Sequence, residues 1–161
     1  MPMRELDQEV ASVIQFINTT AGEDVSPYYW KMPADFIVPA VYYPSPEITT
    51  NGDALNSYEM SYTWYIKFFC VEDEDAHQIA LNVLTAIQGA RRCIPLIAPD
   101  GSRTGRDFKL LDPRIRPVER GVWQMEVRWE SPRYYDREAV QKAVMLYISG
   151  LGGSLYGNKD D

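Results

Sequence analysis

The stretch of residues 57–92 constrains the fold of this chain more than any other part of the sequence. Its first half has a large, mostly apolar side chain at every second position, which is typical of a strand with one buried face; these are Tyr58, Met60, Tyr62, Trp64, Ile66, Phe68 and Cys70. After an acidic run at 72–75, the apolar residues change to helical spacing, at Ala76, Ile79, Ala80, Val83, Leu84 and Ile87. The sequence therefore predicts a long strand followed by a helix laid on the sheet.

Three other segments have a clear period. Residues 4–18 predict an amphipathic helix, whose apolar face consists of Leu6, Val10, Val13, Ile14 and Ile17. Residues 122–130 alternate like a strand, with Trp123, Met125, Val127 and Trp129 on one face. A last helix is predicted from Asp136 to Gly150, with Val140, Ala143, Val144, Tyr147 and Ile148 on a common face.

The remaining segments are less regular. Residues 36–43 have the composition of a strand, and Pro39 cannot donate to a ladder, so this strand is expected at an edge or a bulge. Residues 44–56 are rich in turn formers and include Asn51-Gly52, which predicts an antiparallel connection. Residues 108–118 predict a strand interrupted by prolines.

Two segments are predicted as loops. Residues 23–36 are rich in proline and aromatic residues without a period, so they predict an ordered loop pinned by Tyr29 and Trp30, whose aromatic side chains could equally form an interface. Residues 98–107 combine proline, glycine, serine, aspartate and arginine, which predicts a mobile surface loop.

This order of elements predicts an α+β fold. Strands grouped in hairpins indicate a two-layer sandwich, in which two to three helices cover one face of a mainly antiparallel sheet of four to five strands. We expect a single domain over residues 1–150 and a flexible C-terminal tail over 151–161. The other sheet face is then available to neighbouring subunits.

Composition excludes several classes of protein. At 161 residues with 45% hydrophobic side chains, the chain resembles a soluble globular protein, and no apolar run approaches the ~18 residues of a membrane span. The amphipathic N-terminus predicts no signal peptide and hence a cytoplasmic location. A net charge of −7 disfavours a broad phosphate-binding surface. The two cysteines are expected to be reduced.

No motif for catalysis or cofactor binding emerges. His77 is the only histidine and is expected on a solvated helix surface, while the carboxylates at 72–75 fit a helix N-terminus better than a metal site. The sequence GSRTGR at 101–106 lacks the GK[ST] ending of a phosphate loop, and no helix is predicted after it. We therefore expect a protein that is not an enzyme and that uses no cofactor or metal.

One pattern from about residue 56 to 144 resembles a known family. A helix runs into Arg-Arg-Cys-Ile-Pro-Leu at 91–96, a Gly/Asp loop follows, and then Leu110, Arg114 and a strand ending in Trp-Glu-Ser-Pro-Arg-Tyr-Tyr-Asp at 129–136. This order is similar to that of the tail-terminator, or tail-completion, proteins of long-tailed bacteriophages. The proline-rich N-terminal quarter and the Gly-rich tail depart from small members of that family.

The resemblance implies a non-enzymatic structural protein of the virion tail or neck, assembled in the host cytoplasm. It implies a homo-oligomer, expected as a hexameric ring, that sits on the tail tube, stops its growth and docks to a neck or head-completion protein. DNA would pass through the lumen without specific binding, and no membrane is involved.

Contact residues follow from side-chain chemistry. Arg103 and Arg106 can form fork-like pairs with carboxylates of a neighbour, and Tyr65, Phe69 and Tyr135 suit the centre of an interface. The alternative is that the arginines are solvated and the aromatic residues fill the core. Two other functions stay open, another head-to-tail joining protein and a non-viral α+β domain that binds a small ligand.

Overall fold

The computed structural model describes residues 2–52 and 54–135, so the predicted helix at 136–150 and the tail at 151–161 lie outside the described residues. The described residues form two compact units, a larger one that holds residues 2–49 and 61–130 and a smaller one that holds residues 50–52, 54–60 and 131–135. The elements are α1 (Pro2–Ala21), β1 (Ser26–Tyr29), β2 (Ala40–Tyr43), β3 (Glu47–Gly52), β4 (Ser57–Phe69), α2 (Asp73–Gly89), β5 (Cys93–Ile97), β6 (Arg103–Lys109), β7 (Arg114–Glu119) and β8 (Val122–Tyr134).

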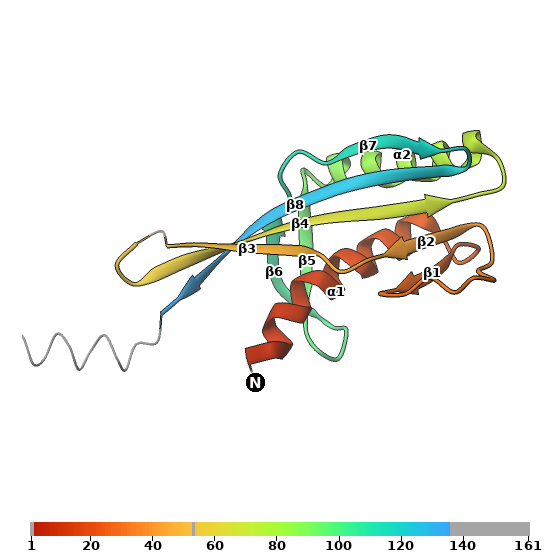
Figure 1. The fold of residues 1–161 in the computed structure, drawn as a ribbon. Helices are drawn as coiled ribbons and strands as arrows, with labels where there is room; N and C mark the ends of the chain where they lie inside the picture. The colour runs from red at the N-terminus through yellow and green to blue at the C-terminus, as the bar shows by residue number, and fades with distance from the viewer. Residues whose placement is uncertain (1, 53, 136–161) are drawn as a thin grey trace, which may run out of the picture. The chain divides into compact units, whose positions relative to one another are not determined.

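A six-stranded sheet is the central feature of the fold (Figure 1). Its strand order is β1-β2-β4-β8-β7, and β3 also pairs with β4. The pairs β2–β4 and β7–β8 are antiparallel, whereas β1 and β2 are parallel. A separate antiparallel sheet consists of β5 and β6. In the larger unit, both helices lie on the same side of the six-stranded sheet (Figure 1), so the predicted two-layer α+β sandwich is confirmed.

The core forms between the helices and the inward faces of β4 and β8. The predicted alternation on β4 is confirmed, because Tyr62, Trp64, Ile66 and Phe68 are all buried. From β8, the rings of Trp129 and Tyr62 stack with centroids 4.6 Å apart, and the ring of Trp64 meets Trp129 edge-on. Both helices contribute buried side chains, which are Val13 and Ile17 from α1 and Ala76, Ala80, Val83 and Ile87 from α2.

Several element predictions are wrong in detail. The strand at 36–43 is not an edge strand, because β2 lies between β1 and β4. Pro39 lacks a donor, but its carbonyl accepts a hydrogen bond from Ser26 N at 3.0 Å, and β1 begins there inside the predicted loop at 23–36. Residues 47–52 form β3 rather than a turn.

The predicted mobile loop at 98–107 is also wrong, because β6 already begins at Arg103 and pairs with β5. A short turn makes this possible. Ala98 N donates to Ser102 O at 2.8 Å and Gly101 N donates to Ala98 O at 2.9 Å. The Asp100 carboxylate accepts from both Ser102 N and Ser102 Oγ, and these hydrogen bonds hold the pKa of Asp100 below its usual value.

Candidate subunit interface

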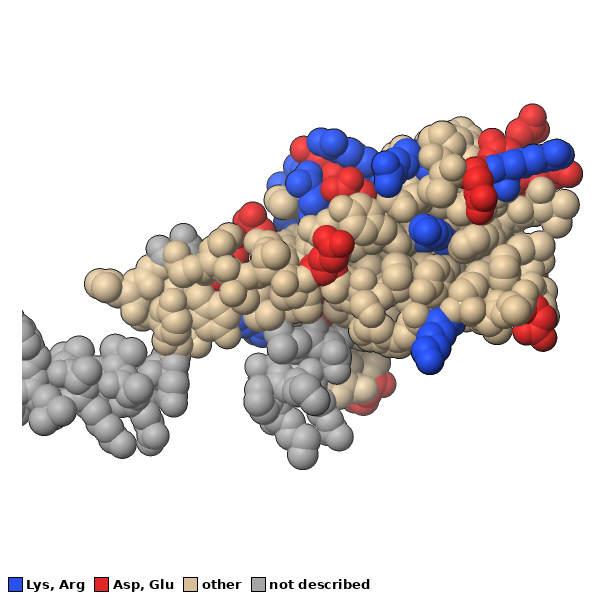
Figure 2. Space-filling model, viewed as in Figure 1, with Lys and Arg blue, Asp and Glu red and all other residues tan. Residues whose placement is uncertain are grey.

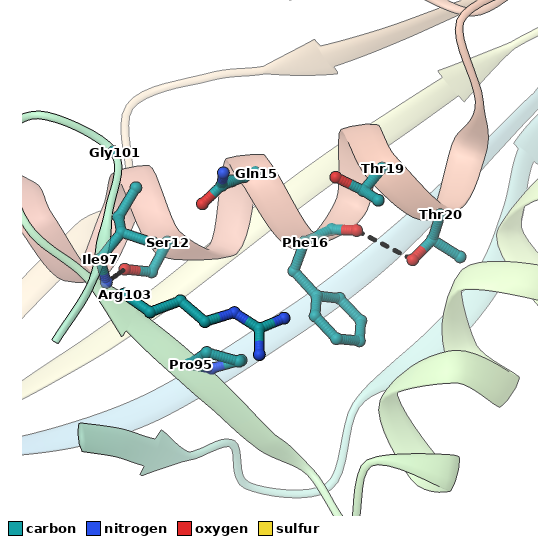
Figure 3. Close-up of a pocket in the computed structure, with 9 residues that line it drawn as sticks. All are labelled: Ser12, Gln15, Phe16, Thr19, Thr20, Pro95, Ile97, Gly101 and Arg103. Atoms are coloured by element: carbon teal, nitrogen blue, oxygen red, sulfur yellow. Dashed lines mark hydrogen bonds between the residues drawn. The ribbon is translucent and has the colours of Figure 1, made fainter. Parts of the chain in front are cut away.

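A groove lies between α1 and the β5–β6 hairpin in the larger unit (Figure 3). Its volume is about 380 Å³, and its lining residues are Ser12, Gln15, Phe16, Thr19, Thr20, Pro95, Ile97, Gly101 and Arg103. Phe16, Pro95 and Ile97 provide apolar surface, whereas hydroxyl and amide groups come from α1. The groove is therefore lined by both apolar and polar side chains.

One buried hydroxyl joins the two walls of the groove. Ser12 is only 2% exposed, and its Oγ donates to Gln8 O at 2.6 Å within α1. The same Oγ accepts from Ile97 N at 3.0 Å, across the groove. On the hairpin, Thr104 Oγ1 donates to Leu96 O at 2.7 Å and links the two strands. The walls are therefore held together before any ligand binds.

The two predicted arginines differ in their position relative to the groove. Arg103 lines the groove, and Figure 3 shows its guanidinium group extending toward Phe16 and Pro95. Arg106 lies further along β6 and is not among the lining residues. Both side chains are exposed, and within residues 2–52 and 54–135 neither has an ion-pair partner. The structure therefore places Arg103, but not Arg106, in the lining of this groove, and the interface role of both arginines stays a prediction.

The three predicted aromatic residues do not form one patch. Tyr65 and Phe69 of β4 are half-buried and alternate with the core residues, so they lie on the sheet face away from the helices. The Phe69 ring is covered by Phe36, at a centroid distance of 5.1 Å. Figure 2 shows that this face has few charged side chains over β2 and β4, whereas charges gather over β7 and α2.

Tyr135 belongs to the smaller unit. Its ring lies 5.3 Å from the ring of Tyr58, and its backbone N donates to Asn56 O at 3.0 Å. Tyr135 is 40% exposed, and Leu55 in the same unit is fully exposed. The role of Tyr135 at an interface stays a prediction.

A second, apolar groove lies beside α1 at the end of β1. It has a volume of about 240 Å³ and is lined by Val10, Ala11, Ile14, Tyr29, Trp30, Tyr43, Pro44 and Trp64. Trp30 is 61% exposed, although its backbone is fixed by Trp30 N donating to Tyr43 O at 2.9 Å and by Tyr42 OH donating to Trp30 O at 3.0 Å. The aromatic composition of residues 23–36 was the sequence signal for this surface.

The connection between β4 and α2 forms a third distinctive surface. Val71 is 72% exposed, and the acidic residues Asp73, Glu74 and Asp75 occupy the first turn of α2. Asp73 Oδ1 accepts a hydrogen bond from Gly121 N at 3.2 Å, whereas Glu74 and Asp75 are exposed and have no ion-pair partner in the described part of the chain. Between Val71 and these carboxylates, Glu72 pairs with Arg120 at 3.8 Å, so this surface combines an exposed apolar residue, one ion pair and two carboxylates without an ion-pair partner among the described residues.

Comparison with known proteins gives two sequence relatives. No protein-family model matches the chain. The chain is 27% identical over 132 residues to the phage-like element PBSX protein XkdJ of Bacillus subtilis (strain 168). This match covers 82% of this chain and 89% of XkdJ. The chain is 28% identical over 133 residues to the uncharacterized protein YqbJ of the same strain, covering 83% and 90% of the two chains.

One solved structure is also similar. A chain of the structure described as the virion of a native gene transfer agent particle has a TM-score of 0.45 and 15% sequence identity. The match covers 78% of this chain and 93% of that chain.

Among the described residues, no three His, Cys, Asp or Glu side chains are grouped so that they could hold a metal ion, and neither helix is long and apolar enough to cross a membrane. The sequence predicted that His77 is solvated on a helix surface, and this prediction is wrong in detail. His77 is half-buried, and its ring lies 4.5 Å from that of Trp123, so a packing contact explains its position.

Cys70 gives a prediction on pH dependence. Burial, and then the negative charge of Asp75, raises the pKa of the Cys70 thiol. Because the thiolate is the nucleophile, iodoacetamide at pH 8 should react more slowly with folded Cys70 than with the urea-unfolded chain, and the rate should keep rising above the usual pKa of a thiol. Asp75→Asn should speed the reaction a few-fold, measured by mass spectrometry of the Cys70 peptide; an unchanged rate would contradict the role of Asp75.

Proposed function

We propose that this chain is a structural protein of phage-like particles that forms a ring on the end of the tail tube. In this role it stops growth of the tube and provides the surface that docks to a neck or head-completion protein. The observation that carries the proposal is the match with the PBSX protein XkdJ, which extends over 82% of this chain. XkdJ is, by its name, a protein of a phage-like element.

The position at the tail end rests on the resemblance to tail terminators. The Arg91-to-Leu96 motif joins the end of α2 to β5, and the motif that begins at Trp129 forms the end of β8. The α+β fold supports the proposal, because one sheet face is covered by helices and the other is left for contacts with neighbours. The net charge of −7 suits a ring whose lumen does not hold DNA.

The decisive experiment combines mass and electron microscopy. The native mass of the purified protein should be that of a ring, expected as a hexamer, alone or after addition of purified tail tubes. Negative-stain images should show it capping one end of the tubes. Binding to DNA-filled heads without tubes would favour another head-to-tail joining protein. A monomer or dimer that binds neither would overturn the proposal and favour the small-ligand-binding alternative.

Reversing the charge of both arginines of the β5–β6 hairpin should disrupt assembly without unfolding the protein. Arg103→Glu together with Arg106→Glu is expected to leave the monomer folded, because both side chains are exposed without ion-pair partners in the described residues. The same change is expected to prevent ring assembly, because it places carboxylates where a neighbour offers carboxylates. Circular dichroism checks the fold and light scattering measures the mass. A normal ring-sized peak would contradict the assignment.

A further inference from the structure

Two surfaces of the larger unit combine apolar side chains with charges of opposite sign. The α1/β5–β6 groove has the apolar side chains of Phe16 and Pro95 beside Arg103, which has no ion-pair partner among the described residues. The β4–α2 corner, residues 71–75, has an apolar residue that is 72% exposed, Val71, followed by the unpaired carboxylates of Glu74 and Asp75. A planar guanidinium group can bind a carboxylate through two parallel hydrogen bonds, so these groups match each other.

These surfaces cannot meet within one chain. The corner precedes the first turn of α2, whereas β5 and the groove follow its last turn. With 17 residues, α2 is about 25 Å long, at about 1.5 Å per residue. Figure 1 shows the corner and the β5–β6 turn at different ends of the larger unit. A second copy of the chain must therefore supply the corner that fits a given groove.

We propose that the β4–α2 corner of one copy docks in the α1/β5–β6 groove of the next copy, with Val71 over Phe16 and Pro95 and the carboxylates on Arg103. The contact joins two different patches, so it is head-to-tail, and repetition of such a contact closes a ring when the rotation between copies allows it. This inference rests on the proposed function and assigns the two faces of its ring contact.

The α1 wall of the groove favours this docking. On the hairpin turn, Asp100 stays ionised, because the two hydrogen bonds from Ser102 lower its pKa, so the attraction of Arg103 has to outweigh its negative charge. Gln15 and Thr19 of α1 are exposed at the border of the groove and can donate further hydrogen bonds to a carboxylate. Ser12 already holds α1 to Ile97, so the groove needs no rearrangement to accept a neighbour.

The test is a charge-reversal cycle on the full-length protein. Arg103→Glu alone, and Glu74→Arg with Asp75→Arg, should each raise the concentration at which the assembly forms by about tenfold or more. The combination of all three changes should recover most of that loss, because the charges attract again with their signs exchanged. Arg106→Glu is the matched control, since it changes the same charge outside the groove and should have a much smaller effect.

Sedimentation across a concentration series measures assembly, and thermal melting shows that each variant is folded. If the triple variant assembles no better than its parents, or Arg106→Glu is as harmful as Arg103→Glu, the assigned contact is overturned while the ring function stands. If the wild-type chain forms no ring, with or without tail tubes, the proposed function fails and this contact fails with it. Recovery in the triple variant supports both.

Discussion

Replacing Trp129 with alanine is expected to lower the free energy of unfolding by about 3 to 5 kcal/mol. Trp129 is fully buried, and its ring stacks on Tyr62 at a centroid distance of 4.6 Å, with interplanar angle 5°. It also contacts Trp64 edge-on, and its Nε1 donates to Glu9 Oε2 at 2.7 Å. The substitution therefore leaves a large cavity and removes aromatic contacts worth about 0.5 to 1.5 kcal/mol per pair. Whole domains are stable by only about 5 to 15 kcal/mol.

Trp30→Ala provides the matched control. This substitution removes the same kind of side chain from a surface position, because Trp30 is 61% exposed. The free energy of unfolding should therefore fall by a small fraction of the loss expected for Trp129→Ala. Urea unfolding with a constant slope measures both changes as shifts of the midpoint. Equal losses for the two variants would mean that the Tyr62–Trp129 stack does not organise the core.

The parts of the fold that the sequence predicted correctly are those with one buried face. In β4, and in β8 from Met125 to Trp129, the alternation of apolar side chains reports the burial directly, and α2 shows the helical equivalent. At the start of β8 the alternation is misleading, because Gln124 is buried and Trp123 is only half-buried. The missed strands carry no such signal. All six residues of β3 are exposed, and β6 is exposed except at Phe108. Their pairing depends on backbone N–H and C=O groups, which every residue except proline provides, so side-chain periodicity cannot reveal it.

The candidate interface was only partly predictable for a related reason. Arginine at 103 was a reasonable contact residue by its chemistry, and the same argument applied equally to Arg106. The difference between them arises because α1 packs against β5, and the Ser12–Ile97 hydrogen bond joins positions 85 residues apart. Likewise, the exposure of Val71 beside the acidic turn depends on how β4 meets α2. Grooves are products of long-range packing, which local sequence patterns do not encode.

Gly121→Ala is expected to destabilise the protein by about 2 to 5 kcal/mol, from a different cause. Gly121 has φ of +77°, where a side chain costs about 1 to 2 kcal/mol. A Cβ atom there would lie 2.5 Å from the carbonyl oxygen of Cys70. That backbone cannot simply move away, because Cys70 N donates to Gly121 O at 2.9 Å and Gly121 N donates to Asp73 Oδ1 at 3.2 Å. Relief of the clash adds about 1 to 3 kcal/mol.

Gly105→Ala separates the cost of the backbone conformation from the cost of the clash with the Cys70 carbonyl. Gly105 has nearly the same φ, +79°, but a Cβ atom there would have no neighbour within 4 Å. The loss in free energy of unfolding for Gly105→Ala should therefore come from the backbone conformation alone, about 1 to 2 kcal/mol. Chemical unfolding of both variants gives the difference, which measures the close approach of the β7–β8 turn to the end of β4. A difference near zero would show that this contact can relax, and that the end of β4, where the proposed acidic corner begins, is not held in place by Gly121.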